Sequence, residues 1–542
     1  MKTLLPFIYL LIITPFILPA ISTLPDIAKQ QKILNNEKKA FDRIEKQKSN
    51  QILHFKIEKP ILSVEEDKHC FITKEIEENT LTLLSKEEKD SVFSKYIHKC
   101  NGMKGLKNLT NELTSLYIKK GFITSKVYLK PQNISSGLVK IHAIEGKISE
   151  FSNKDLEIQM AFFLQEKKNL NLRDLEIGIE NLNSLSSNHA KLKLKPSSSI
   201  GSTIIEIENK KTSPLNGYLM FNNYGEKNTG KYQGSGTLNV DNLVGFGDKF
   251  SVGFNSSSHH NKQEYSKGNS YAYTLALGRL RYTFSYSKSR YLQLIKASFN
   301  EYEAHGSSKN YDFDLNYKVF HNQNNKISLG FFLNAYKSKN YIDEATIETS
   351  TYNLSKGGFN LNYLYQSSSF YNSLTLYYTK GLHMFSDFNP TDLEEIFEKY
   401  SLDYTFSKQI ASIKYNLDLH LQYSKDALFS NNQISIGGPY SVRGFKEEGL
   451  SGNTGYYYRN EFSYRGKEKW FKSLTSNYYL AIDGGYIKNE EDTNGGILLG
   501  NSFGVKLSHK NLSFDFSYST ALKKNDVENN KSFLAANMVY RF

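Results

Sequence analysis

The two cysteines of this 542-residue chain, Cys70 and Cys100, are the reactive side chains whose chemistry is most narrowly limited by their spacing. Residues 71–99 separate them, which is not the spacing of a Cys-x-x-Cys redox or zinc pair. If the chain is exported, we expect a structural disulfide, because disulfides persist in oxidising compartments. Loop-entropy arithmetic assigns such a bond roughly 3–4 kcal/mol of stability. Two independent buried thiols are the alternative.

Sequence motifs for phosphate binding and for zinc-dependent hydrolysis are absent. The chain contains neither GxxxxGK[ST] nor HExxH, and its 12 histidines are scattered rather than clustered with the cysteines. We therefore predict that the protein is not an enzyme, with no catalytic residue, no metal and no cofactor. A site assembled from scattered polar residues is the alternative.

Residues 1–22 have the composition of a secretory signal peptide. Lys2 precedes a long apolar run that ends near Ser22, where we expect cleavage. A retained membrane anchor is the alternative, since about 18 apolar residues are just long enough to span a bilayer. Pro6 and Pro15 disfavour a helix of that kind.

Composition excludes two broad classes of protein. Mean hydropathy is −0.51, which excludes a conventional helical membrane protein. The net charge of +13 comes from 68 Lys+Arg against 55 Asp+Glu, but the basic residues are mixed with acidic and polar ones rather than gathered in blocks. A nucleic-acid partner is therefore disfavoured. An aromatic content of 14% with only 10 prolines favours strands.

Four segments with distinct sequence patterns follow the predicted signal peptide. Residues 23–50 predict a mostly polar helix with one narrow apolar stripe, and residues 51–65, with Pro60, predict a linker. Residues 66–145 and 146–211 each mix helical and strand patterns, which predicts two small α+β modules. Gly121 follows a helical stretch in the first of them and fits a left-handed helix cap.

From residue 212 onward the hydrophobic period becomes two. Between Ile413 and Tyr423, for example, apolar residues alternate with polar or charged ones. A soluble sandwich also shows this pattern, but a transmembrane barrel places the charged face inward and the aromatic face toward lipid. Residues 212–542 accommodate about 16 strands at roughly 9–11 membrane-crossing residues each. The alternation continues to Tyr540 and Phe542 at the C-terminus.

Four short blocks in the C-terminal third identify a family. They are Gly437-Gly438-Pro439-Tyr440-Ser441-Val442-Arg443-Gly444-Phe445, Gly452-Asn453-Thr454-Gly455, Arg459-Asn460-Glu461 and Ala481-Ile482-Asp483-Gly484-Gly485. Together they resemble the transporter component of two-partner secretion systems, the TpsB proteins of haemolysin and filamentous-haemagglutinin secretion in the BamA-like superfamily. Residues 117–125 and Glu145-Gly146 resemble the first polypeptide-transport-associated (POTRA) domain of the same proteins.

The resemblance implies a fold of α+β POTRA domains followed by a transmembrane antiparallel β-barrel. The POTRA domains are residues 66–145 and 146–211, and the barrel is residues 212–542. The helix of residues 23–50 is implied to plug the lumen, or alternatively to lie against a POTRA domain. Tyr540 and Phe542 resemble the last-strand signal of outer-membrane barrels.

The resemblance also implies an anchored loop. In the family the Val-Arg-Gly-Phe tip folds back into the lumen, so Arg443 is expected to meet Asp483 on the barrel wall, with Gly444 turning the tip and Phe445 packing on the wall. Because a water-filled lumen screens charges, we expect this contact to contribute only about 1 kcal/mol of stability. The family pattern has Phe at Ala481 and Gly-Asp at Gly452-Asn453, which puts local packing in doubt.

The function implied by the resemblance is ATP-independent export. POTRA domains in the periplasm would recognise the N-terminal secretion domain of a large exoprotein, a haemolysin or an adhesin, which then crosses the outer-membrane barrel unfolded. Further partners are outer-membrane lipid and the barrel assembly machinery. The alternatives are an insertase of the BamA/TamA type, which typically has more POTRA domains, and a solute-conducting porin, which needs none.

Overall fold

The computed structural model describes residues 67, 69–258, 264–296, 300–385, 387–446, 449–466, 474–491, 494–524 and 532–542. The predicted signal peptide (1–22), plug helix (23–50) and linker (51–65) lie outside these residues. No helix in the described part of the chain is both long and apolar enough to cross a membrane.

The first module combines a three-stranded sheet with two helices. Its elements are β1 (Phe71–Ile72), β2 (Glu75–Glu78), α2 (Lys86–Phe93), β3 (Cys100–Asn101), α3 (Met103–Lys119), β4 (Lys126–Leu129) and β5 (Leu138–Ile144). The sheet has the order β2-β5-β4, and α3 buries Leu106, Leu109 and Leu113 in the core because they recur on one helical face. Gly121, directly after α3, has φ +98°, the left-handed cap that its sequence position predicts.

The second module has the same kind of architecture. Its elements are β6 (Lys147–Phe151), α4 (Leu156–Ala161), α5 (Leu172–Asn183), β7 (Ala190–Pro196) and β8 (Ser202–Asn209). The sheet order is β6-β8-β7, and α5 packs Leu175 and Ile179 into the core that Ile205 of β8 shares. The amide of Leu172 donates to the carbonyl oxygen of Gly121 at 2.8 Å, which joins the two modules through backbone.

The remaining chain forms a closed antiparallel barrel in which β27 pairs with β9. Sixteen long strands are described, and the two-residue β16 (Ala345–Thr346) only extends one hairpin. The long strands are β9 (Leu215–Asn222), β10 (Tyr232–Asp241), β11 (Lys249–Ser258), β12 (Tyr265–Leu277), β13 (Leu280–Lys296), β14 (Glu301–His321), β15 (Asn325–Ile342), β17 (Tyr352–Gln366), β18 (Phe370–Leu382), β19 (Glu398–Ile410), β20 (Ile413–Ser424), β23 (Gly455–Arg465), β24 (Leu474–Ile487), β25 (Gly496–His509), β26 (Leu512–Lys524) and β27 (Ser532–Arg541).

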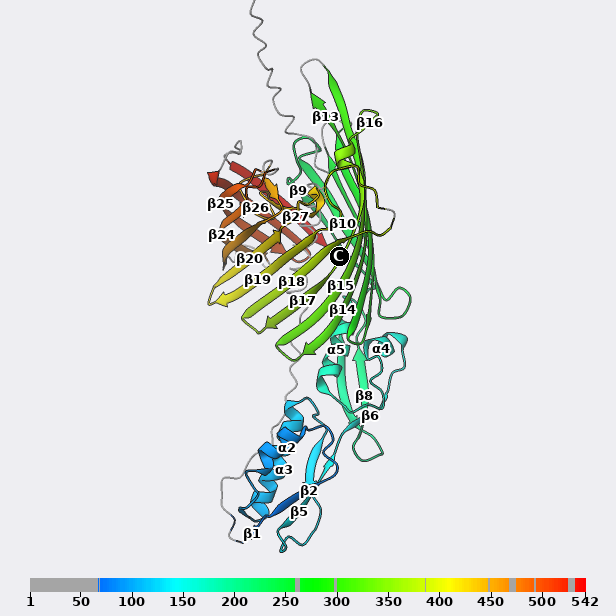
Figure 1. Ribbon diagram of the computed structural model, residues 1–542, viewed down its shortest axis with the longest axis vertical. Coiled ribbons are helices and arrows are strands. Elements are labelled where there is room, and N and C mark those ends of the chain that lie inside the picture. The colour runs from blue at the N-terminus through cyan, green and yellow to red at the C-terminus, as the bar shows by residue number, and fades with distance from the viewer. Residues whose placement is uncertain are drawn as a thin grey trace, which may run out of the picture.

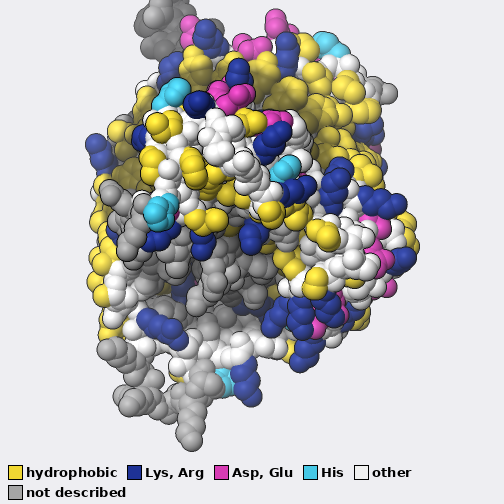
Figure 2. All heavy atoms as spheres, turned by 90° about the horizontal axis from the view of Figure 1, so that it is seen from below, with side chains coloured by type: hydrophobic (Ala, Val, Ile, Leu, Met, Phe, Trp, Pro, Cys, Tyr) yellow, Lys and Arg dark blue, Asp and Glu magenta, His cyan; other side chains and the backbone are white. Residues whose placement is uncertain are grey.

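Alternation along the strands separates two faces. Ile413, Leu421 and Tyr423 of β20 are 40–49% exposed, and seen from below hydrophobic side chains line much of the outer rim of the molecule (Figure 2). Polar residues of the same strand, such as Asp418 and Gln422, lie on the opposite face. The arrangement confirms the predicted fold class, α+β modules followed by a 16-stranded barrel. In Figure 1 the second module lies below β14 and β15, and the first module lies farther from the barrel.

Candidate functional site

The loop between β20 and β23 carries the Val-Arg-Gly-Phe tip. It contains a 3-10 turn, η2 (Ser430–Asn432), and a short hairpin of β21 (Ile434–Ile436) and β22 (Leu450–Gly452). Gly437 and Gly438 have φ of +105° and +95°, so the chain turns sharply just before the tip. The loop therefore has secondary structure of its own, which holds the tip in place.

Arg443 contacts Asp483 of β24 through three hydrogen bonds. Its Nε and Nη2 donate to the two oxygens of Asp483 at 2.6 and 2.9 Å, and its backbone amide donates to Oδ2 at 3.1 Å. This is the two-bond fork that a guanidinium makes and an ammonium does not. The structure thus brings together the two residues that the resemblance paired.

Gly444 and Phe445 fix the tip against the barrel wall. Gly444 has φ +100°, and a Cβ there would lie 2.5 Å from the backbone of Thr520 on β26. Phe445 is buried in a cluster with Val442, Ile487 and Leu498. The tip is therefore packed on apolar side chains as well as paired by charge.

The expectation of a solvent-screened contact is wrong. Arg443 is only 7% exposed and Asp483 is fully buried. The physical reason is that the loop brings its own apolar cluster into the lumen, and this cluster excludes water from the pair. Asn453, where the family pattern has Asp, is also buried; its Oδ1 accepts from the amide of Leu428 at 2.9 Å.

A second carboxylate completes the anchor, and the sequence reasoning did not assign it a role. Nη1 of Arg443 donates to Oε2 of Glu461 at 3.0 Å, and Nζ of Lys506 donates to Oε1 of Glu461 at 2.5 Å. Arg443 and Lys506 also lie over the ring of Tyr479, at 5.9 and 4.4 Å from its centre. The sequence did contain a signal for Glu461. The period-two pattern places Glu461 and Asp483 on the same face of adjacent strands.

The second module contacts the nearer rim of the barrel through a separate charged cluster. Glu180 of α5 accepts from Lys326 at 2.8 Å and from Lys318 at 3.3 Å, and His321 lies 3.6 Å away. Burial alone would raise the pKa of Glu180, but the positive charges of Lys318 and Lys326 lower it below its usual value. Glu180 is thus a shared acceptor for cations from β14 and β15.

Two further contacts extend the docking to the turn between β12 and β13. Arg279 donates from Nη2 to Oδ1 of Asp174 at 2.6 Å, and Asn181 donates to the carbonyl oxygen of Gly278 at 2.7 Å. The amide of Gly278 in turn donates to the carbonyl of Met160 at 2.9 Å. Because these residues come from segments far apart in the sequence, no local motif predicts the cluster.

Asp241, the last residue of β10, and Asn242, which follows it, contact the second module. Oδ2 of Asp241 accepts from the amide of Ser187 at 2.9 Å, and the side chain of Asn242 donates to Glu157 at 3.0 Å. The connection between β10 and β11 therefore closes a hairpin of the barrel. It also holds the second module.

Cys70 and Cys100 are joined by a disulfide, with their Cα atoms 5.2 Å apart. The bond lies beside the β1–β3 pair, in which Ile72 is opposite Cys100. At the other end of the chain, the backbone of Phe542 exchanges two hydrogen bonds with Gly217 of β9, at 3.0 and 3.1 Å. Tyr540 is opposite Leu219 in the same closing pair, and its ring stacks on that of Phe542.

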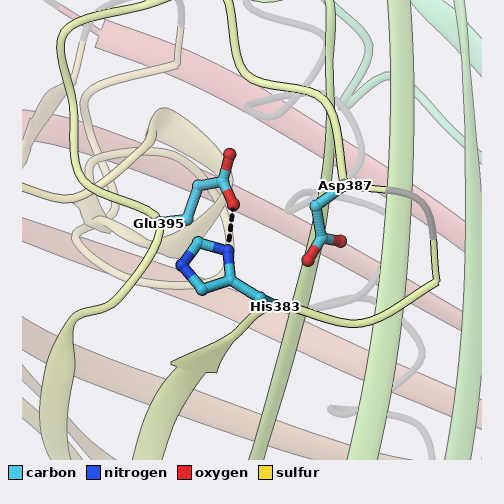
Figure 3. Close-up of side chains that lie close together, drawn as sticks. All are labelled: His383, Asp387 and Glu395. Carbon is cyan, nitrogen blue, oxygen red and sulfur yellow. Dashed lines mark ion pairs between the residues drawn. The ribbon is translucent and has the colours of Figure 1, made fainter.

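Two constellations resemble chemical sites but have structural explanations. His383, Asp387 and Glu395 lie together in the loop between β18 and β19 (Figure 3), where His383 pairs with Glu395 at 2.7 Å. Asp387 already accepts from the hydroxyl of Ser355 and the amide of Met384, both at 2.5 Å, so loop closure accounts for the cluster.

The second constellation is a Gly-x-Ser-x-Gly match at residues 500–504, which lies in the middle of β25. A nucleophile elbow needs a strand-to-helix turn with an exposed serine. Ser502 is instead 1% exposed, and its hydroxyl accepts from Ser519. The match therefore gives no support to a hydrolase.

Comparison with known proteins agrees with this geometry. The family described as haemolysin secretion/activation protein ShlB/FhaC/HecB matches residues 201–507, and POTRA domains, the first of ShlB type, match residues 71–146 and 140–196. The outer membrane transporter CdiB of Dickeya dadantii is 28% identical over 460 residues, which cover 82% of this chain and 81% of the relative. The hemolysin transporter protein ShlB of Serratia marcescens is 27% identical over 424 residues, 77% of this chain and 75% of the relative.

A solved structure extends the likeness to three dimensions. CdiB from Escherichia coli superposes with a TM-score of 0.85 at 25% identity, covering 95% of this chain and 98% of that chain. The modules are therefore POTRA domains in the periplasm, and the barrel lies in the outer membrane. Because the family match covers more than half of its residues, the chain belongs to the ShlB/FhaC/HecB haemolysin secretion/activation family, the outer-membrane transporters of two-partner secretion.

Proposed function

We propose that the POTRA modules capture the N-terminal secretion domain of one large exoprotein and pass it, unfolded, into the barrel. Relatives are named as transporters of haemolysins, which supports a secreted cytolysin or adhesin as the partner. The chain carries no nucleotide-binding motif, so movement is driven by successive binding and by folding on the far side. The fixed position of the second module at the periplasmic rim is the observation that carries this proposal.

Strand addition to the second module is the capture mode that this geometry favours. β7 is the last strand of the sheet β6-β8-β7, so its outer edge has no strand partner in the described residues. Main-chain hydrogen bonds to an edge accept an extended chain of varied sequence. Contacts of α5 with the rim hold this sheet beside the barrel mouth.

The Arg443 anchor supports a second part of the proposal, that the loop stays in the lumen and narrows the path between exoproteins. The predicted helix of residues 23–50 would act with it as a withdrawable plug. Deletion of residues 24–50 is expected to raise channel conductance in planar bilayers. Unchanged conductance would remove the helix from this role.

Two remaining partners are proposed on the outer surface of the barrel. The apolar outer face of the barrel contacts outer-membrane lipid. The barrel assembly machinery recognises Tyr540 and Phe542 at the C-terminus. Replacing Phe542 with Ser is expected to lower the amount of assembled barrel without changing its synthesis. A transporter with this fold needs no enzymatic activity.

The decisive experiment compares surface, supernatant and outer-membrane proteins of cells with and without the gene. Loss of one large exported protein, with other barrels unchanged, is expected. A broad fall in outer-membrane barrels would instead indicate an insertase. No change in either fraction would favour a solute channel.

A further inference from the structure

The outer face of β12, β13 and β14 shows where the membrane ends. Moving outward along the strands, lipid-facing residues such as Phe284 and Phe313 give way to one row of directly opposed tyrosines, Tyr271, Tyr286 and Tyr311. Their rings lie 6.3 and 5.0 Å apart across the strands. Aromatic girdles of this kind mark the level of the lipid headgroups.

This girdle lies on the extracellular side. The turn between β12 and β13 contacts the periplasmic second module, since Gly278 is hydrogen-bonded to Met160. β13 therefore runs outward from Leu280, and β14 returns toward the periplasm. Residues 287–296 of β13 and 301–310 of β14 lie beyond the girdle, at or above the outer-leaflet headgroups.

Two rows of cations follow the girdle on the same outward face. In the first row Lys288, Lys309 and Lys337 are directly opposite one another on β13, β14 and β15. In the second row, two residues farther out, Lys267 is opposite Arg290, and Lys339 stands on β15. Directly opposed residues on antiparallel strands hold their Cβ atoms roughly 4.5–5.5 Å apart.

No acid stands in either row. The other residues at these register positions are asparagines and serines, such as Asn269 and Ser307. None of the six cations forms an ion pair with any described residue. The nearest acids on the outward face of β14, Glu303 and Glu301, lie farther out toward the loop. Like charges directly opposite one another destabilise a sheet unless an anion lies between them.

β18, which only the long strand β17 separates from β15, arranges its outward charge differently. On β18 the outward face continues from Tyr378 to Lys380, which is directly opposite Glu398, and then to Leu382. Their charged atoms are 3.9 Å apart. An outward-facing cation is thus balanced within the protein on β18 and β19 but left unbalanced on β12–β15.

We propose that the outward face of β12–β15 binds a phosphorylated glycolipid of the outer leaflet, with Lys288, Lys309 and Lys337 on its phosphate groups. The apolar strand faces below the girdle receive the acyl chains. Ammonium and guanidinium groups bind phosphate through charge-assisted hydrogen bonds. The site is independent of the exoprotein path, because all six cations face away from the lumen.

Native mass spectrometry of the purified full-length protein tests this with bis-phosphorylated lipid A as the probe. The wild type is expected to retain one lipid A, and the triple variant Lys288→Gln/Lys309→Gln/Lys337→Gln to bind it roughly 100-fold more weakly. Lys380→Gln, on the same outward face of the barrel but originally paired with Glu398, is the matched control and is expected to bind like wild type. If the triple variant fails to assemble, Lys309→Gln alone is expected to lose part of the affinity.

Three results would overturn the proposal. Wild-type affinity in both the triple variant and Lys309→Gln would show that the lysines make no contact. Equal retention of dephosphorylated lipid A would reduce the site to apolar contact. Full displacement of lipid A by inorganic phosphate at about 10 mM would identify free phosphate as the ligand.

Discussion

The lumen anchor around Arg443 and the rim cluster around Glu180 are both ion-pair networks, but they are built in opposite ways. Asp483 is fully buried and receives three hydrogen bonds from one residue. The side chain of Glu180 keeps 28% of its exposure and shares its charge among cations from two strands.

This difference in burial determines how much stability each network loses when one of its charged partners is removed. Breaking a buried pair leaves an uncompensated charge and costs several kcal/mol, whereas a half-exposed pair is partly replaced by water. The anchor is therefore suited to holding one loop conformation. The rim cluster is suited to positioning a domain through many weak contacts, which fail one by one.

Removing the carboxylate of the anchor is expected to have the largest effect. Asp483→Asn leaves Glu461 as the remaining carboxylate of the buried Arg443 guanidinium, so the expected cost is about 3 kcal/mol of barrel stability, the lower end of the range for a broken buried pair. Urea unfolding in detergent measures this loss. Asp418→Asn, another lumen carboxylate outside the anchor, is the control, and equal losses in the two variants would remove the special status of Asp483.

Gly444→Ala tests how tightly the tip is packed. The new Cβ would meet the backbone of Thr520 at 2.5 Å, and the left-handed φ adds about 1–2 kcal/mol. We expect a total loss of roughly 2–4 kcal/mol. Gly245→Ala is a matched control, since its φ is +90° with nothing within 4 Å of the new Cβ, and it isolates the backbone strain. Equal losses would mean that the tip is not closely packed.

Charge reversal at the rim is expected to cost less and to be reversible. Glu180→Lys should weaken docking of the second module by about 1–2 kcal/mol, and Lys326→Glu in the same chain should restore part of it. Double electron–electron resonance between labels at positions 198 and 510 would show a broader distance distribution in the single variant. Glu150→Lys, on the exposed face of β6, is the control.

The same cluster predicts a pH dependence. The folded pKa of Glu180 is lowered, so its contribution is fully present above its unfolded value near 4.5 and is lost as pH falls through the lower folded value. The distance distribution of the wild type should therefore stay narrow at pH 7 and broaden in acid. If the distance distribution of Glu180→Gln broadens in acid to the same extent, the pH dependence comes from other titratable groups.

The contrast also shows what the sequence could predict. Arg443 and Asp483 lie in short motifs, so their pairing followed from the family resemblance that these motifs carry, and the number of strands followed from the period-two pattern and the length of the segment. Their burial did not, because it depends on how the whole loop folds back over Ile487 and Leu498. Glu180 meets Lys318 and Lys326 only after the barrel has closed, and no motif marks such a contact between distant segments.

The smallest expected effect concerns Glu145 of the first module, a single carboxylate that accepts hydrogen bonds from neutral donors. Glu145 accepts from the hydroxyl of Tyr117 at 2.7 Å and from the amide of Leu83 at 2.9 Å. Burial alone would raise its pKa, but these hydrogen bonds and one from the Thr82 hydroxyl lower it. The resulting stability is present above the unfolded pKa near 4.5 and is lost as pH falls through the folded value.

In thermal unfolding, the fragment 67–211 is therefore expected to be less stable at pH 4 than at pH 7. The part of this difference that comes from Glu145 is expected to be under about 1 kcal/mol. Glu145→Gln keeps the shape and one acceptor but removes the titration, so its stability should change less between these pH values. Because Glu145 is held by neutral groups, added salt should leave its contribution unchanged. Salt should weaken the rim cluster of Glu180, which depends on opposite charges. An equal response of both sites to salt would mean that the charges of Lys318 and Lys326 do not set the strength of docking.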